Sequence, residues 1–160
     1  MNTRPSPNAV DRKDIDRYIN LAESIGLHSV ANTTKWQRLL DHMRNRRGWV
    51  PLYRCCCIDS EVSGWDREWW YHVPIPFISV EWLELSTIEE VTRGAMVYSR
   101  EIDHSEWIID FLESAKFEFD KVGSNIRIFG YIPRNYTMKP TRLTNKTAHT
   151  NPLPRHKSKS

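Results

Sequence analysis

The chain has 160 residues, of which 39% are hydrophobic and 11% aromatic, a length and composition that suit one globular domain with its own core. Its apolar runs are too short to cross a membrane, its first residues lack the apolar segment of a secretory signal, and its three cysteines are consecutive rather than spaced as a disulfide framework. These features argue against a membrane-spanning or a disulfide-rich secreted protein, and they predict a cytoplasmic location.

The charge is unevenly distributed along the chain. The formal net charge is +3, yet all 20 acidic residues lie between Asp11 and Asp120. Residues 51–120 contain fifteen acidic and five basic residues, whereas residues 131–160 contain seven basic residues and no acidic one. The acidic body is either a solvated surface or a surface for a basic protein partner. The predicted tail, residues 134–160, contains a single aromatic residue, Tyr136, so it offers no stacking platform and we expect no nucleic-acid partner.

Two helices are predicted in the N-terminal part of the chain. Residues 1–10 are polar and contain two prolines, so a flexible N-terminus is expected there. Apolar residues recur at helical spacing in residues 11–25 and again in 34–45, and Gly26 and Gly48 follow these segments as natural stops. The two apolar stripes consist of Ile15, Tyr18, Ile19 and Ala22, and of Trp36, Leu39, Leu40 and Met43.

Strand patterns come next. The segments VPLYRCCCID, REWWYHV and ISVEWLEL are rich in β-forming residues. In the second segment, strand alternation would place Trp69 and Tyr71 on one face and Trp70 and His72 on the other, and the prolines that follow would end the strand or place it at an edge. Residues 87–100 show no clear period, and TIEEVTRGAM within them could form a short helix.

The C-terminal half is predicted to contain one helix and a hairpin. The segment DHSEWIIDFLESAK has helical spacing, and KFEFD and IRIFGYI alternate on the two sides of a glycine-bearing turn. Apolar periodicity ends after Pro133, which predicts a basic disordered tail over residues 134–160. The chain is therefore predicted to be α+β, with a single domain over residues 11–133. Two N-terminal helices precede a mostly antiparallel sheet of about four to five strands interrupted by a helix.

No residue pattern indicates a known catalytic or metal centre. In a strand, Cys55 and Cys57 point to one face and Cys56 to the other, and no nearby histidine completes a tetrahedral set, so we expect metal-free cysteines that pack in the core. No glycine-rich phosphate loop or H-E-x-x-H motif is present, and no cofactor is expected. His72 is the best catalytic candidate, although a lone histidine on a strand is more often structural.

The tryptophans carry the main functional hypothesis. Because Trp69 and Trp70 would alternate, Trp69, Trp70 and Trp82 cannot all face one interior. Either both faces of the sheet are covered, or one tryptophan lies at the surface, where aromatic residues anchor partners. We expect Trp70 and His72 to line such a patch, with carboxylates that steer a basic partner. The predicted binding residues are Trp70, His72, Asp66, Glu68, Glu81 and Trp82.

Four segments occur in a characteristic order: TKWQRLLDHM at 34–43, WWYHVP at 69–74, SVEWLEL at 79–85 and IRIFGY at 126–131. Their K-W, W-Y-H-x-P, S-x-E-W-L and I-R-I-x-G-Y motifs resemble those of a small bacterial family of unknown function. The resemblance covers about residues 32–132 and implies no known activity.

These observations favour a non-enzymatic, cytoplasmic protein-binding protein. In size, architecture and charge it resembles immunity proteins that neutralise toxins, an analogy at the level of protein class. The alternative is a small enzyme or ligand-binding protein with a pocket around His72, Glu81 and Asp66. A purely structural or regulatory partner is a third interpretation.

Overall fold

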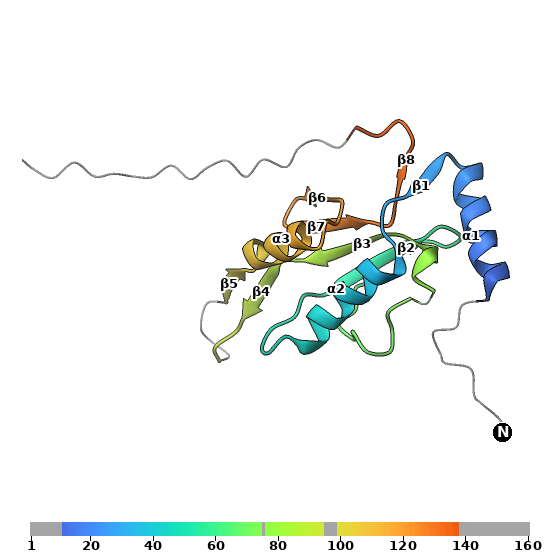
Figure 1. Ribbon diagram of the computed structural model, residues 1–160. Coiled ribbons are helices and arrows are strands. Elements are labelled where there is room, and N and C mark those ends of the chain that lie inside the picture. The colour runs from blue at the N-terminus through green and yellow to red at the C-terminus, as the bar shows by residue number, and fades with distance from the viewer. Residues whose placement is uncertain (1–10, 75, 95–98, 138–160) are drawn as a thin grey trace, which may run out of the picture.

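The computed structural model describes residues 11–74, 76–94 and 99–137, and it confirms the predicted α+β class (Figure 1). A helix followed by two strands occurs twice: α2 (Thr33–Asn45), β2 (Tyr53–Cys57) and β3 (Val80–Ser86), then α3 (Ser105–Ser114), β6 (Phe119–Val122) and β7 (Asn125–Phe129). The strands β4 (Ile88–Val91) and β5 (Arg100–Asp103) pair as a hairpin between these two units. The remaining elements are α1 (Arg12–Ser24), β1 (Leu27–Ser29), the 3-10 helix η1 (Phe77–Ser79) and β8 (Tyr131–Pro133).

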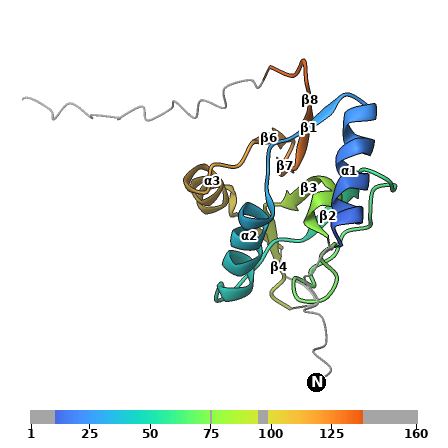
Figure 2. The same cartoon turned by 45° about the vertical axis from the view of Figure 1, so that its right-hand side comes forward.

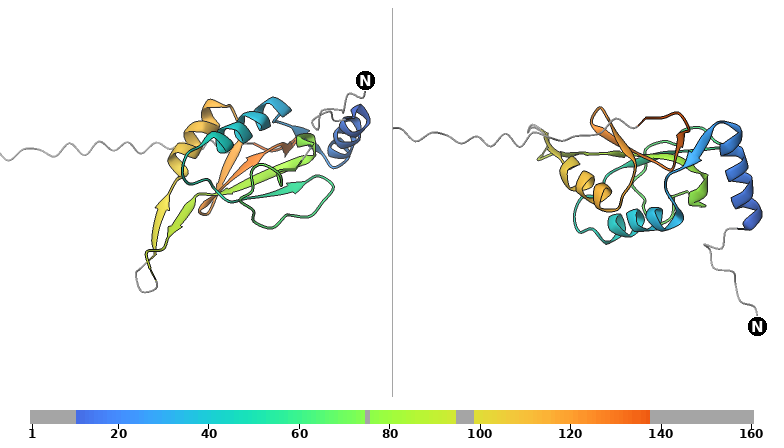
Figure 3. Two further views of the ribbon diagram at one scale, coloured as in Figure 1. Left: turned by 90° about the horizontal axis from the view of Figure 1, so that it is seen from below. Right: turned by 45° about the horizontal axis from the view of Figure 1, so that its top comes forward.

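The main sheet is antiparallel and has the strand order β2-β3-β7-β6, so the second strands of the two units lie side by side at its centre. Helices α2 and α3 cover one face of this sheet (Figures 2 and 3). Between the helices and the sheet lies the core, to which the central strands contribute Leu83, Leu85, Ile126 and Ile128. The predicted sheet of about four to five strands, interrupted by a helix, is confirmed.

The helix patterns in the sequence correspond to the buried faces. Helix α2 begins after Asn32, whose side-chain oxygen accepts a hydrogen bond from the backbone N–H of Lys35 at 2.9 Å. Its apolar stripe is almost completely buried, and the Trp36 ring packs against Phe117 with a centroid separation of 5.5 Å. Asp11 caps α1 in the same way, accepting from the N–H of Lys13 at 3.2 Å. Periodicity therefore located both N-terminal helices.

A smaller cluster joins the two ends of the described chain. Strand β1 pairs with β8 outside the main sheet, and Ala22 of α1, Leu27 and Tyr131 bury their side chains together. The Tyr131 hydroxyl donates a hydrogen bond to the carbonyl oxygen of Ile78 at 2.6 Å. Just before β8, the backbone at Gly130 passes so close to β3 that an added Cβ would lie 2.1 Å from the Val80 carbonyl oxygen. Only glycine fits there.

The face of the main sheet opposite the helices, called the open face below, carries a row of charges across all four strands. Arg54, Glu84, Arg127 and Asp120 are successive cross-strand neighbours on β2, β3, β7 and β6. Glu84 is fully buried; it accepts hydrogen bonds from Arg54 at 3.0 Å and from Arg127 at 2.8 and 3.1 Å. Burial would raise the pKa of Glu84, but hydrogen bonds from Arg127, Asn125 and Arg54 hold it below its ordinary value.

One local prediction was wrong, and a segment left open by the sequence forms a strand. The segment REWWYHV is an irregular loop with turns rather than a strand, because its hydrogen-bonding groups are satisfied by side chains and turns. The segment TIEEVTRGAM was considered as a short helix, yet residues 88–91 form strand β4, and the partner strand β5 supplies the pairing that the local sequence does not reveal.

The tryptophans divide between several environments. Trp36 and Trp69 are buried in the core and Trp107 is half-buried against it, whereas Trp82 lies on the open face. Trp70 is 58% exposed. The expected flexible N-terminus (residues 1–10) lies outside the described residues, as do residues 138–160 of the expected tail. Residues 134–137 are described, and the Tyr136 hydroxyl donates to the Asp120 carboxylate at 2.9 Å.

Candidate functional site

Residues 58–74, called the aromatic loop below, concentrate exposed apolar side chains. Of the eight large hydrophobic residues that are exposed in the described part of the chain, four lie in this segment. They are Val62 (48% exposed), Trp65 (41%), Trp70 (58%) and Tyr71 (87%). Trp65 lies against the Arg54 guanidinium and Trp70 against that of Arg44, at 4.7 and 4.8 Å from the ring centres. Exposed tryptophan and tyrosine side chains are enriched at interaction sites.

The first part of the loop is fixed to the outer edge of β2. The N–H of Ser63 donates to the Cys55 carbonyl at 2.8 Å, and Tyr53 and Asp66 exchange two backbone hydrogen bonds, each of 2.8 Å. The Arg17 guanidinium forms an ion pair with Asp59 at 2.8 Å and links the loop to α1. The loop therefore covers what would otherwise be a free strand edge.

The second part of the loop is anchored by one tryptophan and displays the next. Trp69 is 3% exposed; its indole N–H donates to the Pro51 carbonyl at 3.0 Å. Arg44 of α2 donates to the carbonyl oxygens of Trp69 and Trp70 at 2.9 and 3.0 Å, and its guanidinium lies 4.8 Å from the centre of the Trp70 ring. Trp70 is thus held from one side while its other side faces solvent.

Two carboxylates, those of Asp66 and Glu68, stabilise the loop conformation through hydrogen bonds within the loop. Asp66 accepts from the N–H of Glu68 at 2.8 Å and faces Nδ1 of His72 at 2.7 Å, and Glu68 accepts from the N–H of Trp70 at 2.8 Å. The hydrogen bond from the Glu68 N–H, with that from His72, holds the pKa of Asp66 below its ordinary value. Asp66, Glu68 and His72, predicted as binding residues, are therefore brought together beside Trp70.

A cavity of about 390 Å³ lies between the aromatic loop and β2. Tyr53, Cys55 and Cys57 of β2 form one wall, and the loop contributes the Asp66–His72 pair and two serines, Ser60 and Ser63. Two of the three residues of the predicted alternative pocket, His72 and Asp66, thus meet at one cavity. The third, Glu81, does not line it.

Glu81 and Trp82 belong to a different region. The Glu81 residue lies in β3 at a register shift opposite Cys56 and Cys57, where its carbonyl oxygen accepts from the N–H of Gly130 at 2.8 Å. Trp82 lies on the open face with the Arg127 guanidinium 4.1 Å from its ring centre. The expectation that Glu81 rims the Trp70 patch depended on treating residues 67–73 as a strand of the sheet, which they are not.

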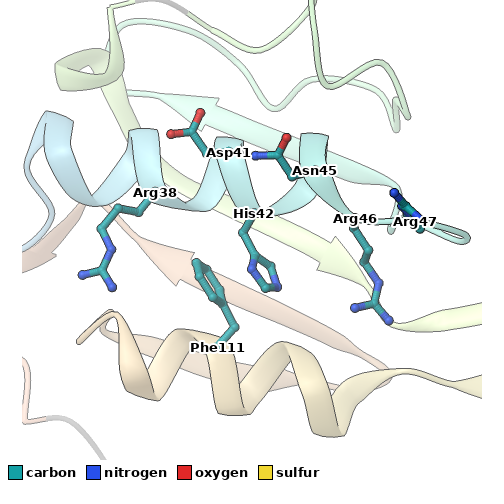
Figure 4. A pocket seen from close by; sticks show the side chains of 7 residues that line it. All are labelled: Arg38, Asp41, His42, Asn45, Arg46, Arg47 and Phe111. Atoms are coloured by element: carbon teal, nitrogen blue, oxygen red, sulfur yellow. The ribbon is translucent and has the colours of Figure 1, made fainter.

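A second hollow, of about 520 Å³, lies between α2 and α3 (Figure 4). Arg38, Arg46 and Arg47 line it, so its charge is opposite to that of the aromatic loop. His42 stacks on Phe111 with a centroid distance of 3.9 Å, and burial together with nearby Arg46 lowers the pKa of His42. The Arg46 guanidinium lies 3.5 Å from the Trp107 ring centre, which makes it part of the packing between the helices.

Sequence reasoning missed several residues of the aromatic loop. Trp65 and Tyr71 are exposed there but were not selected, and Arg44 was overlooked because a basic residue near a helix end already suits the helix dipole. The available signal was the SEVSG segment directly before Trp65, because its serines and glycine indicate a turn and hence exposure. No sequence pattern connects Arg44 with Trp70, because 26 residues separate them.

Comparison with known proteins places the chain in one family. The model of DUF6678, a family of unknown function, matches residues 18–135, so the chain belongs to that family. The match extends beyond the expected residues 32–132 and includes the second part of α1. No curated protein and no solved structure matches the chain. Among the described residues, no helix has the length and apolar character needed to cross a bilayer.

Proposed function

We propose that this member of the DUF6678 family is a protein-binding protein that recognises its partner with the aromatic loop. The observation that carries the proposal is the exposure of Trp65, Trp70 and Tyr71 on one loop whose backbone is fixed at both halves. Tryptophan and tyrosine are enriched among residues that dominate binding energy. A loop that is already ordered loses little conformational entropy on binding, so more of the contact energy contributes to affinity.

The charge of the loop suggests the chemistry of the partner. Residues 58–74 contain Asp59, Glu61, Asp66 and Glu68 against a single basic residue, Arg67. Carboxylates around an aromatic anchor attract a basic surface and accelerate association. We therefore propose a basic protein partner. A toxin neutralised by an immunity protein is one such partner, and that role stays a prediction based on class analogy.

In the test, the full chain is coupled to a resin, and an extract of the native host is passed over it. A variant with Trp70→Ala and Tyr71→Ala removes the two most exposed rings. Val122→Ala, which alters an exposed residue of β6, serves as the matched control. We expect a protein that the wild type and the Val122 variant retain and that the loop variant loses. Once the protein is identified, calorimetry should show a loss of about 2 kcal/mol or more for Trp70→Ala.

Two results would contradict the proposal. One is equal retention of every captured protein by the wild type and the loop variant. The other is the absence of any protein that the wild type retains above a bare resin. Charge is tested with Glu61→Lys, which should slow association with the identified partner more strongly at low than at high salt concentration.

A second function is supported by the cavity behind the loop. Asp66 orients His72 with a 2.7 Å hydrogen bond, an arrangement in which the carboxylate fixes the imidazole for acid–base chemistry or ligand binding. The cavity volume suits a small molecule. Thermal-shift screening of a metabolite library distinguishes this function: a ligand of the cavity should stabilise the wild type, and His72→Ala should abolish that stabilisation while Trp70→Ala retains it.

A further inference from the structure

The three consecutive cysteines occupy different environments. Cys55 and Cys57 point from β2 into the cavity behind the aromatic loop, whereas Cys56 lies on the other side of the strand. Cys55 is buried and Cys57 is half-buried. Both side chains pack in or against the core as expected, and both also form part of the wall of the cavity, with Cys57 the more exposed of the two.

Hydroxyl groups surround the two cavity thiols. The Ser79 hydroxyl lies within hydrogen-bonding distance of Cys57 Sγ, at 3.6 Å, and the Cys55 thiol lies 3.7 Å from the Ser63 hydroxyl oxygen. The neighbouring Cys55 thiol, with Ser79 and Ser60, lowers the pKa of Cys57 to about 6 despite burial. The same pairing and burial raise the pKa of Cys55.

Cys56 differs from both. Burial, together with the nearby Glu81 carboxylate, raises the pKa of the Cys56 thiol. At neutral pH the thiolate form is therefore concentrated on Cys57, and the thiolate is the nucleophilic form of cysteine. The second thiol on the same face, Cys55, is protonated and adjacent, which is the arrangement of a reactive cysteine beside a resolving one.

We propose that Cys55 and Cys57 form a redox-active dithiol that a hydroperoxide oxidises to an intramolecular disulfide, with Cys57 as the attacking thiol and Cys55 as the resolving thiol. This chemistry is independent of partner binding. In the first step the Cys57 thiolate attacks the peroxide: an S–O bond forms, the O–O bond breaks, and the alcohol or water leaves after taking up a proton. The sulfur is oxidised to a sulfenic acid and the peroxide is reduced.

In the second step Cys55 resolves the sulfenic acid. The Cys55 sulfur loses its proton and attacks Cys57 Sγ, the S–S bond forms, the S–O bond breaks, and the leaving hydroxide takes the proton to become water. Two residues of regular strand rise by about 6.6 Å. That value lies near the upper end, about 6.8 Å, of the Cα separations that disulfides span, but the Cβ atoms of such a pair would be equally far apart, beyond the roughly 3.5–4.5 Å that a disulfide needs. The disulfide therefore requires the strand to depart from regular geometry. The register shift between Cys56 and Cys57 departs from regular pairing here. A disulfide at this limit is readily reduced, as regulatory disulfides are.

The first experiment measures alkylation of the reduced full chain by iodoacetamide at neutral pH, followed by peptide mapping. Cys57 should be modified about tenfold or more faster than Cys56, because its thiolate population is larger. The alkylation rate of Cys57 should be unchanged in the Cys56→Ser variant. Modification of Cys56 as fast as Cys57 would overturn the assignment of Cys57 as the reactive thiol.

The second experiment treats the reduced protein with hydrogen peroxide and follows the intact mass. The wild type and Cys56→Ser should each lose two hydrogen atoms in a reaction that dithiothreitol reverses. Cys55→Ser should instead gain one oxygen atom on Cys57 and react with dimedone, a sulfenic-acid reagent. Cys57→Ser should form no intramolecular disulfide. Thermal melts of the reduced variants establish that each is folded before oxidation.

Three results would overturn the proposal: a disulfide that includes Cys56, an intermolecular disulfide as the main product, or a wild-type protein that stays reduced while a model thiol is oxidised. Because mass and alkylation require no partner, these outcomes are separate from the test of partner binding.

Discussion

Glu84 of β3 lies directly opposite Arg127 of β7, and the Arg127 guanidinium donates two hydrogen bonds to one carboxylate oxygen of Glu84, at 3.1 and 2.8 Å. Arg54 and Asn125 donate to the other oxygen, each at 3.0 Å. Because Glu84 is fully buried, these donors replace the water that the carboxylate has lost. The open face is thus covered by arginine and tryptophan side chains instead of a helix.

Removal of Arg127 should destabilise the protein strongly. In Arg127→Met the Glu84 carboxylate keeps its charge but loses two of its four hydrogen bonds. We expect the free energy of unfolding to fall by about 3–5 kcal/mol, measured by urea denaturation. The double variant Arg127→Met with Glu84→Leu should recover part of the loss, because no buried charge remains. A single variant as stable as the wild type would contradict this account.

The Glu84 cluster also predicts a pH dependence. The pKa of Glu84 in the folded protein is below its ordinary value of 4.5, so the ionised carboxylate stabilises the fold above that pH. This stabilisation is lost as the pH falls from 4.5 through the folded-state pKa, where the unfolded chain binds the proton first. Glu84→Gln should be less stable at neutral pH and should lose less stability over the acid range, as followed by thermal melts at successive pH values.

Neighbouring tryptophans of the aromatic loop should respond in opposite ways. Trp69→Ala removes a buried ring that contacts Tyr53, with a centroid distance of 4.5 Å, and should cost about 3–5 kcal/mol. Trp70→Ala removes an exposed ring whose main internal contact is Arg44, and should cost about 1 kcal/mol or less. Chemical denaturation of the two variants side by side measures the difference. Equal losses would mean that Trp70 belongs to the core.

Gly130 should be intolerant of a methyl group. In Gly130→Ala the new Cβ would overlap the Val80 carbonyl oxygen, so β3 or β8 must shift. We expect a loss of about 1–3 kcal/mol. Gly64→Ala is the matched control, since a Cβ there meets no atom within 4 Å. Its melting temperature should be close to that of the wild type, and a similar drop in both variants would contradict the steric explanation.

Two truncations should show that residues 134–137 of the predicted tail contribute to stability, whereas residues 138–160 do not. A chain ending at residue 137 lacks only segments with almost no apolar periodicity, and its melting temperature should be nearly unchanged. A chain ending at Pro133 also loses Tyr136, which bonds Asp120 and packs against Phe129, and the N–H of Arg134, which donates to Gly26. That second truncation should cost about 1–2 kcal/mol. An unchanged melting temperature in both would restore the original boundary at residue 134.

The candidate site was only partly predictable from the sequence. The cluster of aromatic and acidic residues at 65–72 is visible in the composition alone, and it indicated Trp70, His72, Asp66 and Glu68. The strand assumed for this segment led to Glu81 and Trp82, which lie elsewhere. The loop conformation depends on donors and acceptors outside the segment, such as Arg44 and Tyr53, and local propensity contains no information about them.

The sequence by itself determined the α+β class, the two N-terminal helices, α3 and the β6–β7 hairpin, because helical and strand periodicities are local properties that survive without knowledge of neighbours. Only the tertiary structure decided which strands are adjacent, that Glu84 is buried between two arginines, and that Cys55 and Cys57 share a cavity with His72. Each of these arrangements joins residues far apart along the chain, and their proximity depends on strand pairing and on the hydrogen bonds between the aromatic loop and β2, which local propensity does not encode.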